Sequence, residues 1–174
     1  MADGVADPLV RLLYQSWADL DHSIGGLTVE EAGHRFENAS SIAWTVGHLA
    51  FDIDVLINRR LRGLPAHKLI RRRFATGGTG EAVDWAEILV ATSEVRAAAR
   101  ELVDAVPAPD LERAVPYDGP VEYLRESGLT LGYALMAVAA HHFQHAGEIL
   151  TLRSRMGPSV PDEAGWGRIL VEGA

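Results

Sequence analysis

The chain has 174 residues, no cysteine and a formal net charge of −8. This length suits a single domain spanning residues 1–174. The absence of cysteine excludes disulfides, thiolate zinc sites and a thiol nucleophile borne by the protein. The acidic balance argues against nucleic acid as a partner, because Arg71–Arg73 is the only dense basic cluster in the sequence.

Targeting signals are not evident in the sequence. No apolar run has the length that a membrane-spanning helix needs. The first residues do not combine a basic stretch with an apolar one, as a signal peptide would. We therefore expect a soluble, cytoplasmic protein without a membrane partner.

The first helix signals lie close to the N-terminus. Asp7 can cap a helix that begins at Pro8, because proline is favoured at the first helical position. Gly25-Gly26 can end that helix. Thr28-Val-Glu-Glu31 matches a capping box, which predicts a short helix directly after this turn.

The central part of the chain predicts two further long helices. The first of them can be capped by Ser40 or Ser41 and is expected to end by Gly63. Residues 63–82 are rich in arginine and glycine, which predicts a long polar loop. The next helix is expected over residues 83–106, where alanine, glutamate and arginine dominate.

A fourth long helix closes the predicted core. A short helical piece is expected over residues 121–127, and Thr130 then caps a helix that runs to about Met156, before the stop signal Gly157-Pro158. We find no strand alternation and no internal repeat. Four long amphipathic segments predict an all-α four-helix bundle, with a long loop between helices two and three.

Three histidines stand within the apolar stretch of the fourth long helix. Residues i and i+4 share one helix face, with Cβ atoms about 5–6 Å apart, so His141 and His145 can aim their imidazoles at one point. His142 is an alternative to His141, because i,i+3 pairs also meet. Imidazole is the commonest metal ligand in proteins, and His48 is the best candidate for a third ligand. The alternative for each is a core histidine bonded to a backbone carbonyl.

Two carboxylates stand one helical turn beyond these histidines. Asp52 follows His48 by four residues and could accept the free N–H of a ligating imidazole, or act as a fourth ligand. Glu148 follows His145 by three residues and could accept from it in the same way. The alternatives are a solvated Asp52 and a Glu148 paired with a nearby arginine. The remaining histidines stand near helix ends or in loops and are expected at the surface: His22, His34 and His67.

Two blocks of the sequence carry a family resemblance. The first is Ser40-Ser-Ile-Ala-Trp-Thr-Val-Gly-His-Leu-Ala-Phe51, in which a tryptophan precedes a His-Leu pair. The second joins Thr130-Leu-Gly-Tyr-Ala-Leu to His141-His-Phe-Gln-His-Ala-Gly-Glu-Ile149, which contains a His-x-x-x-His-x-Gly pattern. Both are similar to patterns of the DinB-like superfamily, which includes damage-inducible DinB proteins and bacillithiol- and mycothiol-dependent S-transferases.

The resemblance implies a four-helix bundle with a divalent metal on three histidines, which fall here on His48, His141 and His145. Glu148 departs from the pattern, since relatives often have glutamine there. Zinc is the metal expected first, with nickel or iron as alternatives. Three neutral imidazoles leave the cation at least one open position, which is typical of catalytic zinc sites rather than structural ones.

An open three-histidine site predicts metal-dependent chemistry on a small-molecule substrate. Our first hypothesis is a transferase in which a low-molecular-weight thiol, activated as a thiolate, attacks a small electrophile. One alternative is a metal-dependent hydrolase, for which Asp52 and Glu148 are the nearest carboxylates and no general base is evident. Another is a non-catalytic, metal-stabilised binding or stress protein. Homodimerisation through a bundle face is a further hypothesis.

Overall fold

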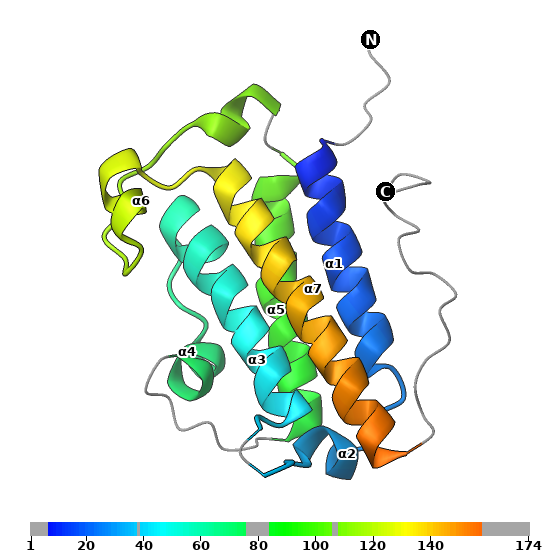
Figure 1. Cartoon of the computed structure of the whole chain (residues 1–174). Coiled ribbons are helices and arrows are strands. Elements are labelled where there is room, and N and C mark those ends of the chain that lie inside the picture. The colour runs from blue at the N-terminus through cyan, green and yellow to red at the C-terminus, as the bar shows by residue number, and fades with distance from the viewer. Residues whose placement is uncertain (1–6, 38, 76–83, 106–107, 158–174) are drawn as a thin grey trace. The chain divides into compact units, whose positions relative to one another are not determined.

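The computed structural model of the chain describes residues 7–37, 39–75, 84–105 and 108–157 (Figure 1). Within these ranges the structure is helical, with one isolated bridge between Val115 and Leu129 and no strand, so the all-α class is confirmed. The chain divides into two compact units, residues 1–42 with 135–174, and residues 43–134. No helix in the described ranges is long and apolar enough to cross a membrane.

The first unit contains α1 (Pro8–Ile24), α2 (Val29–Gly33) and most of α7 (Leu131–Met156). Asp7 and Thr28 cap α1 and α2 as expected from the sequence. The Asp7 carboxylate accepts from the N–H of Leu9 at 2.8 Å. Thr28 and Glu31 form the predicted capping box, in which each side chain accepts from the other residue's N–H. These bonds satisfy N–H groups that have no partner inside a helix, and so they fix where the two helices begin.

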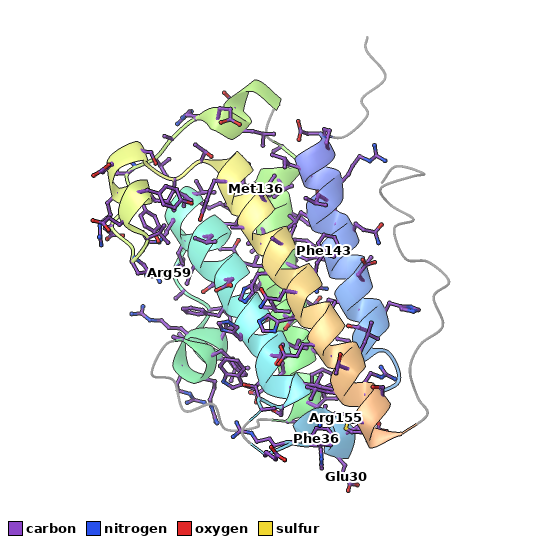
Figure 2. All side chains as sticks on the ribbon, in the orientation of Figure 1. Glu30, Phe36, Arg59, Met136, Phe143 and Arg155 are labelled. Atoms are coloured by element: carbon purple, nitrogen blue, oxygen red, sulfur yellow. The ribbon has the colours of Figure 1, made fainter. Side chains whose placement is uncertain are left out.

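α1 and α7 lie side by side in the first unit, with their C-terminal ends together (Figure 1). Arg153 joins these ends, because its Nη1 atom donates to the carbonyls of Ser23 at 2.7 Å and Gly25 at 2.8 Å. Carbonyls in the last turn of a helix lack intrahelical donors, and the guanidinium supplies them. Close by, the Arg155 guanidinium lies 5.4 Å from the centre of the Phe36 ring (Figure 2). The large apolar side chains that these two helices bury within the first unit are Val10, Leu13, Tyr14, Trp17, Leu20, Leu135, Val138, Ile149 and Leu152.

The second unit is built from six helical segments and the loops between them. They are α3 (Ile42–Ile53), η1 (Asp54–Leu61), α4 (Lys68–Phe74), α5 (Trp85–Val103), η2 (Ala108–Glu112) and α6 (Glu122–Ser127). The second and third long helices of the sequence interpretation are therefore present. The second is α3 with η1, and the third is α5, which begins at the N-cap Asp84.

The second long helix changes its hydrogen bonding at Asp54, where α3 passes directly into the π-helix η1. In a π-helix each N–H reaches the carbonyl five residues back, as the N–H of Arg62 does with Ile57 at 3.1 Å. Side chains hold this widened segment against α5. Asn58 Nδ2 donates to the carbonyl of Val95 at 3.0 Å, and Arg62 donates to the Glu101 carboxylate at 2.6 Å.

The long polar loop expected over residues 63–82 is interrupted by α4. Ile70 and Phe74, four residues apart, are both buried, and they give this short arginine-rich helix an apolar face. His67 caps it, because its Nδ1 accepts from the N–H of Ile70 at 3.4 Å while its Nε2 lies 2.9 Å from the Glu94 carboxylate. His67 is half-buried, and its ring connects α4 to Glu94 of α5. Residues 76–82 of the expected loop lie outside the described residues.

Phe74 of α4 packs directly against Gly47 of α3. A Cβ atom built on Gly47 would lie 2.5 Å from two carbons of the Phe74 ring. That separation is well inside the optimum of about 3.5–4.0 Å between carbon atoms, so only glycine leaves room for the ring. The buried Phe74 thus seats α4 on the turn of α3 that carries His48.

Candidate metal centre

His141 and His145 converge on α7 as their i,i+4 spacing predicts. Their Nε2 atoms are 2.9 Å apart, and their ring centroids are 4.5 Å apart at an interplanar angle of 57°. Both side chains are half-buried. Two ring nitrogens at this separation can be bridged by a proton or can face a common cation.

Glu148 determines which nitrogen of His145 is available. Its Oε2 atom lies 2.6 Å from His145 Nδ1. A carboxylate oxygen only accepts, so Nδ1 carries the proton and a neutral His145 presents its lone pair at Nε2, the atom that faces His141. A carboxylate on the outer nitrogen of a histidine is the usual support of a ligating imidazole. The hydrogen bond that the sequence predicted for Glu148 is therefore present.

His142 has a different environment from its two neighbours. Its side chain is fully buried, and its Nδ1–H donates to the carbonyl of Val138 at 2.8 Å. This is the core arrangement that the sequence left open for each of the three histidines. The structure shows it for His142, and it places His141 beside His145.

His48 lies on α3, where Trp44 holds its ring. The two rings are stacked, with centroids 4.8 Å apart and an interplanar angle of 14°. A flat contact of this kind limits rotation of the imidazole about its χ2 angle. Asp52 follows one turn later on the same helix and is half-buried. Its role beside His48 stays a prediction.

His48, His141 and His145 form a group that could hold a metal ion, because each offers one ligand atom and these atoms all lie within 4.8 Å of one another. Zinc–imidazole bonds of about 2.0–2.1 Å in a tetrahedral site place two nitrogens about 3.3 Å apart. The 2.9 Å between His141 and His145 differs from that value by a few tenths of an ångström. An all-nitrogen donor set suits zinc, nickel and iron. The three residues therefore fit a divalent cation.

The sequence interpretation missed two features of this region. The stacking of Trp44 on His48 follows from the same i,i+4 rule that paired the α7 histidines, so the spacing was a usable signal. The second feature is Asp54, which is 2% exposed and accepts from the N–H of His67 at 3.1 Å. Burial raises the pKa of Asp54, against the opposing effect of that hydrogen bond. Its only signal in the sequence is a carboxylate within an apolar helix face.

A comparison with protein families gives one match. The model described as the DinB superfamily matches residues 12–149. This segment contains both sequence blocks quoted above, and with them the three histidines and Glu148. No curated protein matches the chain.

Proposed function

The chain belongs to the DinB superfamily, since the matching model covers residues 12–149, and on this basis we propose that it is a metal-dependent transferase. In this proposal a low-molecular-weight thiol is joined to a small electrophile. The observation that carries the proposal is the group of three histidines, which could hold a cation with nitrogen donors alone. Zinc is the metal that we propose first.

The absence of cysteine from the chain determines where the nucleophile comes from. Sulfur chemistry here requires a thiol brought in by a substrate. A divalent cation held by the three histidines would lower the pKa of such a thiol and so supply a thiolate near neutral pH. The thiolate then forms a carbon–sulfur bond with the electrophile. For an epoxide, the carbon–oxygen bond breaks and the oxygen takes a proton from water.

Residues of this chain prepare the donor atoms before any substrate arrives. Glu148 keeps the proton of His145 on Nδ1 and leaves the Nε2 lone pair facing His141. Trp44 restricts the plane of the His48 ring. Because Glu148 is engaged with His145, it is a poor general base for water, which favours thiol transfer over hydrolysis.

Conjugation assays test the proposal. Untagged protein loaded with zinc is given glutathione, bacillithiol or mycothiol, together with 1-chloro-2,4-dinitrobenzene or styrene oxide, and the thioether is measured by mass spectrometry. We expect conjugation above the uncatalysed rate that is lost with a chelator and in His145→Ala. The matched control is His34→Gln, which alters an exposed histidine outside the group. No metal-dependent thioether from any pair would refute the transferase, and ester hydrolysis without thiol would favour a hydrolase.

A further inference from the structure

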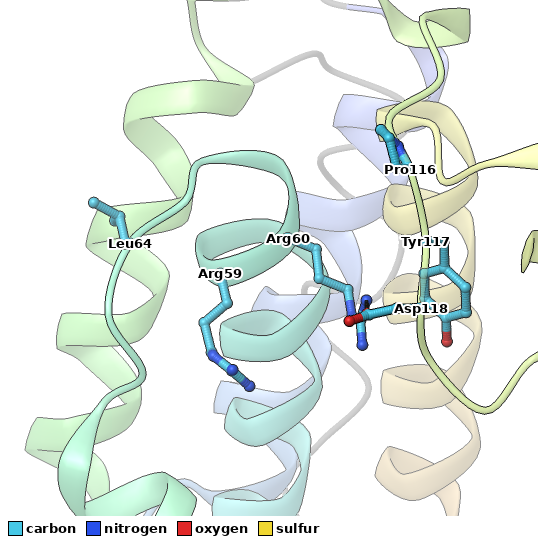
Figure 3. Close-up of a pocket in the computed structure, with 6 residues that line it drawn as sticks. All are labelled: Arg59, Arg60, Leu64, Pro116, Tyr117 and Asp118. Carbon is cyan, nitrogen blue, oxygen red and sulfur yellow. Dashed lines mark hydrogen bonds and ion pairs between the residues drawn. The ribbon is translucent and has the colours of Figure 1, made fainter.

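A polar cavity lies entirely within the unit of residues 43–134. It has a volume of about 490 Å³ and is lined by Arg59, Arg60, Leu64, Pro116, Tyr117 and Asp118. The two arginines come from η1, and Pro116, Tyr117 and Asp118 from the segment that leads to α6 (Figure 3). None of the three histidines of the candidate metal centre is among the lining residues.

The π-helix accounts for two adjacent arginines reaching one cavity. A π-helix has more residues per turn than an α-helix, so side chains of consecutive residues point less far apart. π-helical segments are also frequent at functional sites. Arg59 and Arg60 both line the cavity, and with one facing carboxylate, Asp118, they give it a net positive charge.

Arg60 is held in place before any ligand binds. Its guanidinium lies 4.4 Å from the centre of the Tyr117 ring, and it forms an ion pair with the Asp118 carboxylate (Figure 3). Tyr117 is buried and packs over Gly119, where a Cβ atom would overlap the phenol. Arg125 fixes the backbone of the same loop, because its Nη1 donates to the carbonyl of Gly119 at 3.3 Å. A guanidinium ordered in this way loses little freedom when it binds an anion.

The ion pair with Asp118 shows that the Arg60 guanidinium can bind a carboxylate. Its side chain is 92% exposed, whereas that of Arg60 is 22% exposed, so the carboxylate approaches a fixed arginine from solvent. The hydrogen bond and charge of Arg60 lower the pKa of Asp118, and the charge of Arg59 adds to the effect. An exposed ion pair contributes little to stability, so a carboxylate from solution can replace this one.

Arg59 supplies a second guanidinium for such a ligand. It is half-buried, and among the residues that the structure describes its side chain makes no hydrogen bond or ion pair. A charge-assisted hydrogen bond is about twice as strong as a neutral one, and two guanidiniums can bind both oxygens of one carboxylate. Leu64 and Pro116 offer apolar surface beside the arginines.

We propose that this cavity binds a small organic carboxylate, which displaces Asp118 from Arg60 and is also held by Arg59. The apolar part of the ligand rests on Leu64 and Pro116. Asp118 then acts as a competing anion, so its removal strengthens binding of the ligand. The site is independent of the proposed transferase, because its recognition needs no metal.

Binding of benzoate, benzamide and phenyl phosphate to the full chain tests the proposal, with affinities from NMR titration of backbone amides. Benzamide has the shape of benzoate without its charge. We expect benzoate to shift the amide signals of residues 117–119 and benzamide to leave them unmoved. Arg59→Gln and Arg60→Gln should each weaken benzoate binding by about tenfold or more, as loss of a charge-assisted bond implies. Asp118→Asn should strengthen it by about two- to fivefold, as removal of an exposed ion pair implies.

Arg72→Gln is the matched control, since it removes the same charge from an exposed position on α4 and should leave the affinity unchanged. The proposal is overturned if benzoate shifts none of these residues at its highest soluble concentration, or if benzamide binds as well. Weaker binding in Asp118→Asn would also overturn it. Phenyl phosphate binding tenfold more tightly than benzoate would replace the carboxylate with a phosphate ligand.

Discussion

Replacing Gly47 with alanine tests how closely α4 is seated on α3. In an unobstructed helix interior this change stabilises a protein by about 0.5–1 kcal/mol, because alanine loses less backbone entropy on folding. Here the added methyl group would lie 2.5 Å from two carbons of the Phe74 ring. Forcing a methyl group into a packed core costs about 1–3 kcal/mol. We therefore expect Gly47→Ala to lower the free energy of unfolding by about 1–2 kcal/mol.

The effect of Gly47→Ala on the free energy of unfolding should change sign once the Phe74 ring is removed. Leucine lacks the ε and ζ carbons that a Cβ at position 47 would meet, so in a Phe74→Leu background the same alanine should stabilise by about 0.5–1 kcal/mol. Urea denaturation followed by circular dichroism measures all four proteins, and equal m-values show that the comparison is valid. An equal effect of Gly47→Ala in both backgrounds would refute the close approach of Phe74.

Three further changes test separate contacts. Glu148→Ala should lower zinc affinity by about 10–100-fold, since it removes the acceptor on His145, and competition with a chromogenic chelator measures this. Burial raises the pKa of Asp54, so the folded state holds that proton more tightly and stability falls as pH rises through the raised pKa. Asp54→Asn should abolish this fall in stability. If urea unfolding shows that the variant loses as much stability as the unaltered protein when pH rises through the raised pKa of Asp54, the prediction is wrong. The hydrogen bond with Tyr123, together with burial, raises the pKa of Tyr133 to about 12. Tyr123→Phe should lower it toward 10 in an ultraviolet titration, and an unchanged value would refute the pairing.

Much of the helix order could be predicted because its signals are local. Asp7, Thr28 and Thr130 each accept a hydrogen bond from an N–H two or three residues later, and such bonds can be inferred from a few neighbouring residues. The change to a π-helix at Asp54 was not predictable in this way. It depends on bonds such as that from Asn58 to Val95, 37 residues further along the chain.

α4 shows a second limit of sequence interpretation. Its apolar face consists of Ile70 and Phe74 only, within a run of basic residues, and its cap is His67 rather than one of the usual capping residues. The partner that buries Phe74 is a glycine 27 residues earlier, and nothing in the sequence marks Gly47 as a contact. Periodicity detects an amphipathic helix of several turns but not one of seven residues.

The candidate metal centre was predictable in part for the same reasons. The i,i+4 spacing predicts that His141 and His145 converge, and i,i+3 spacing predicts the bond from Glu148. Spacing alone left His142 as an alternative to His141. The structure distinguishes them through the backbone, because the carbonyl of Val138 accepts from the His142 ring.

The metal content of untagged protein tests the central proposal most directly. After incubation with zinc and removal of unbound ions, we expect one zinc ion per chain by elemental mass spectrometry. His48→Ala, His141→Ala and His145→Ala should each lose it, and His34→Gln should keep it. Full zinc content in His48→Ala, or no bound zinc in the unaltered protein, would contradict a site made by these three histidines.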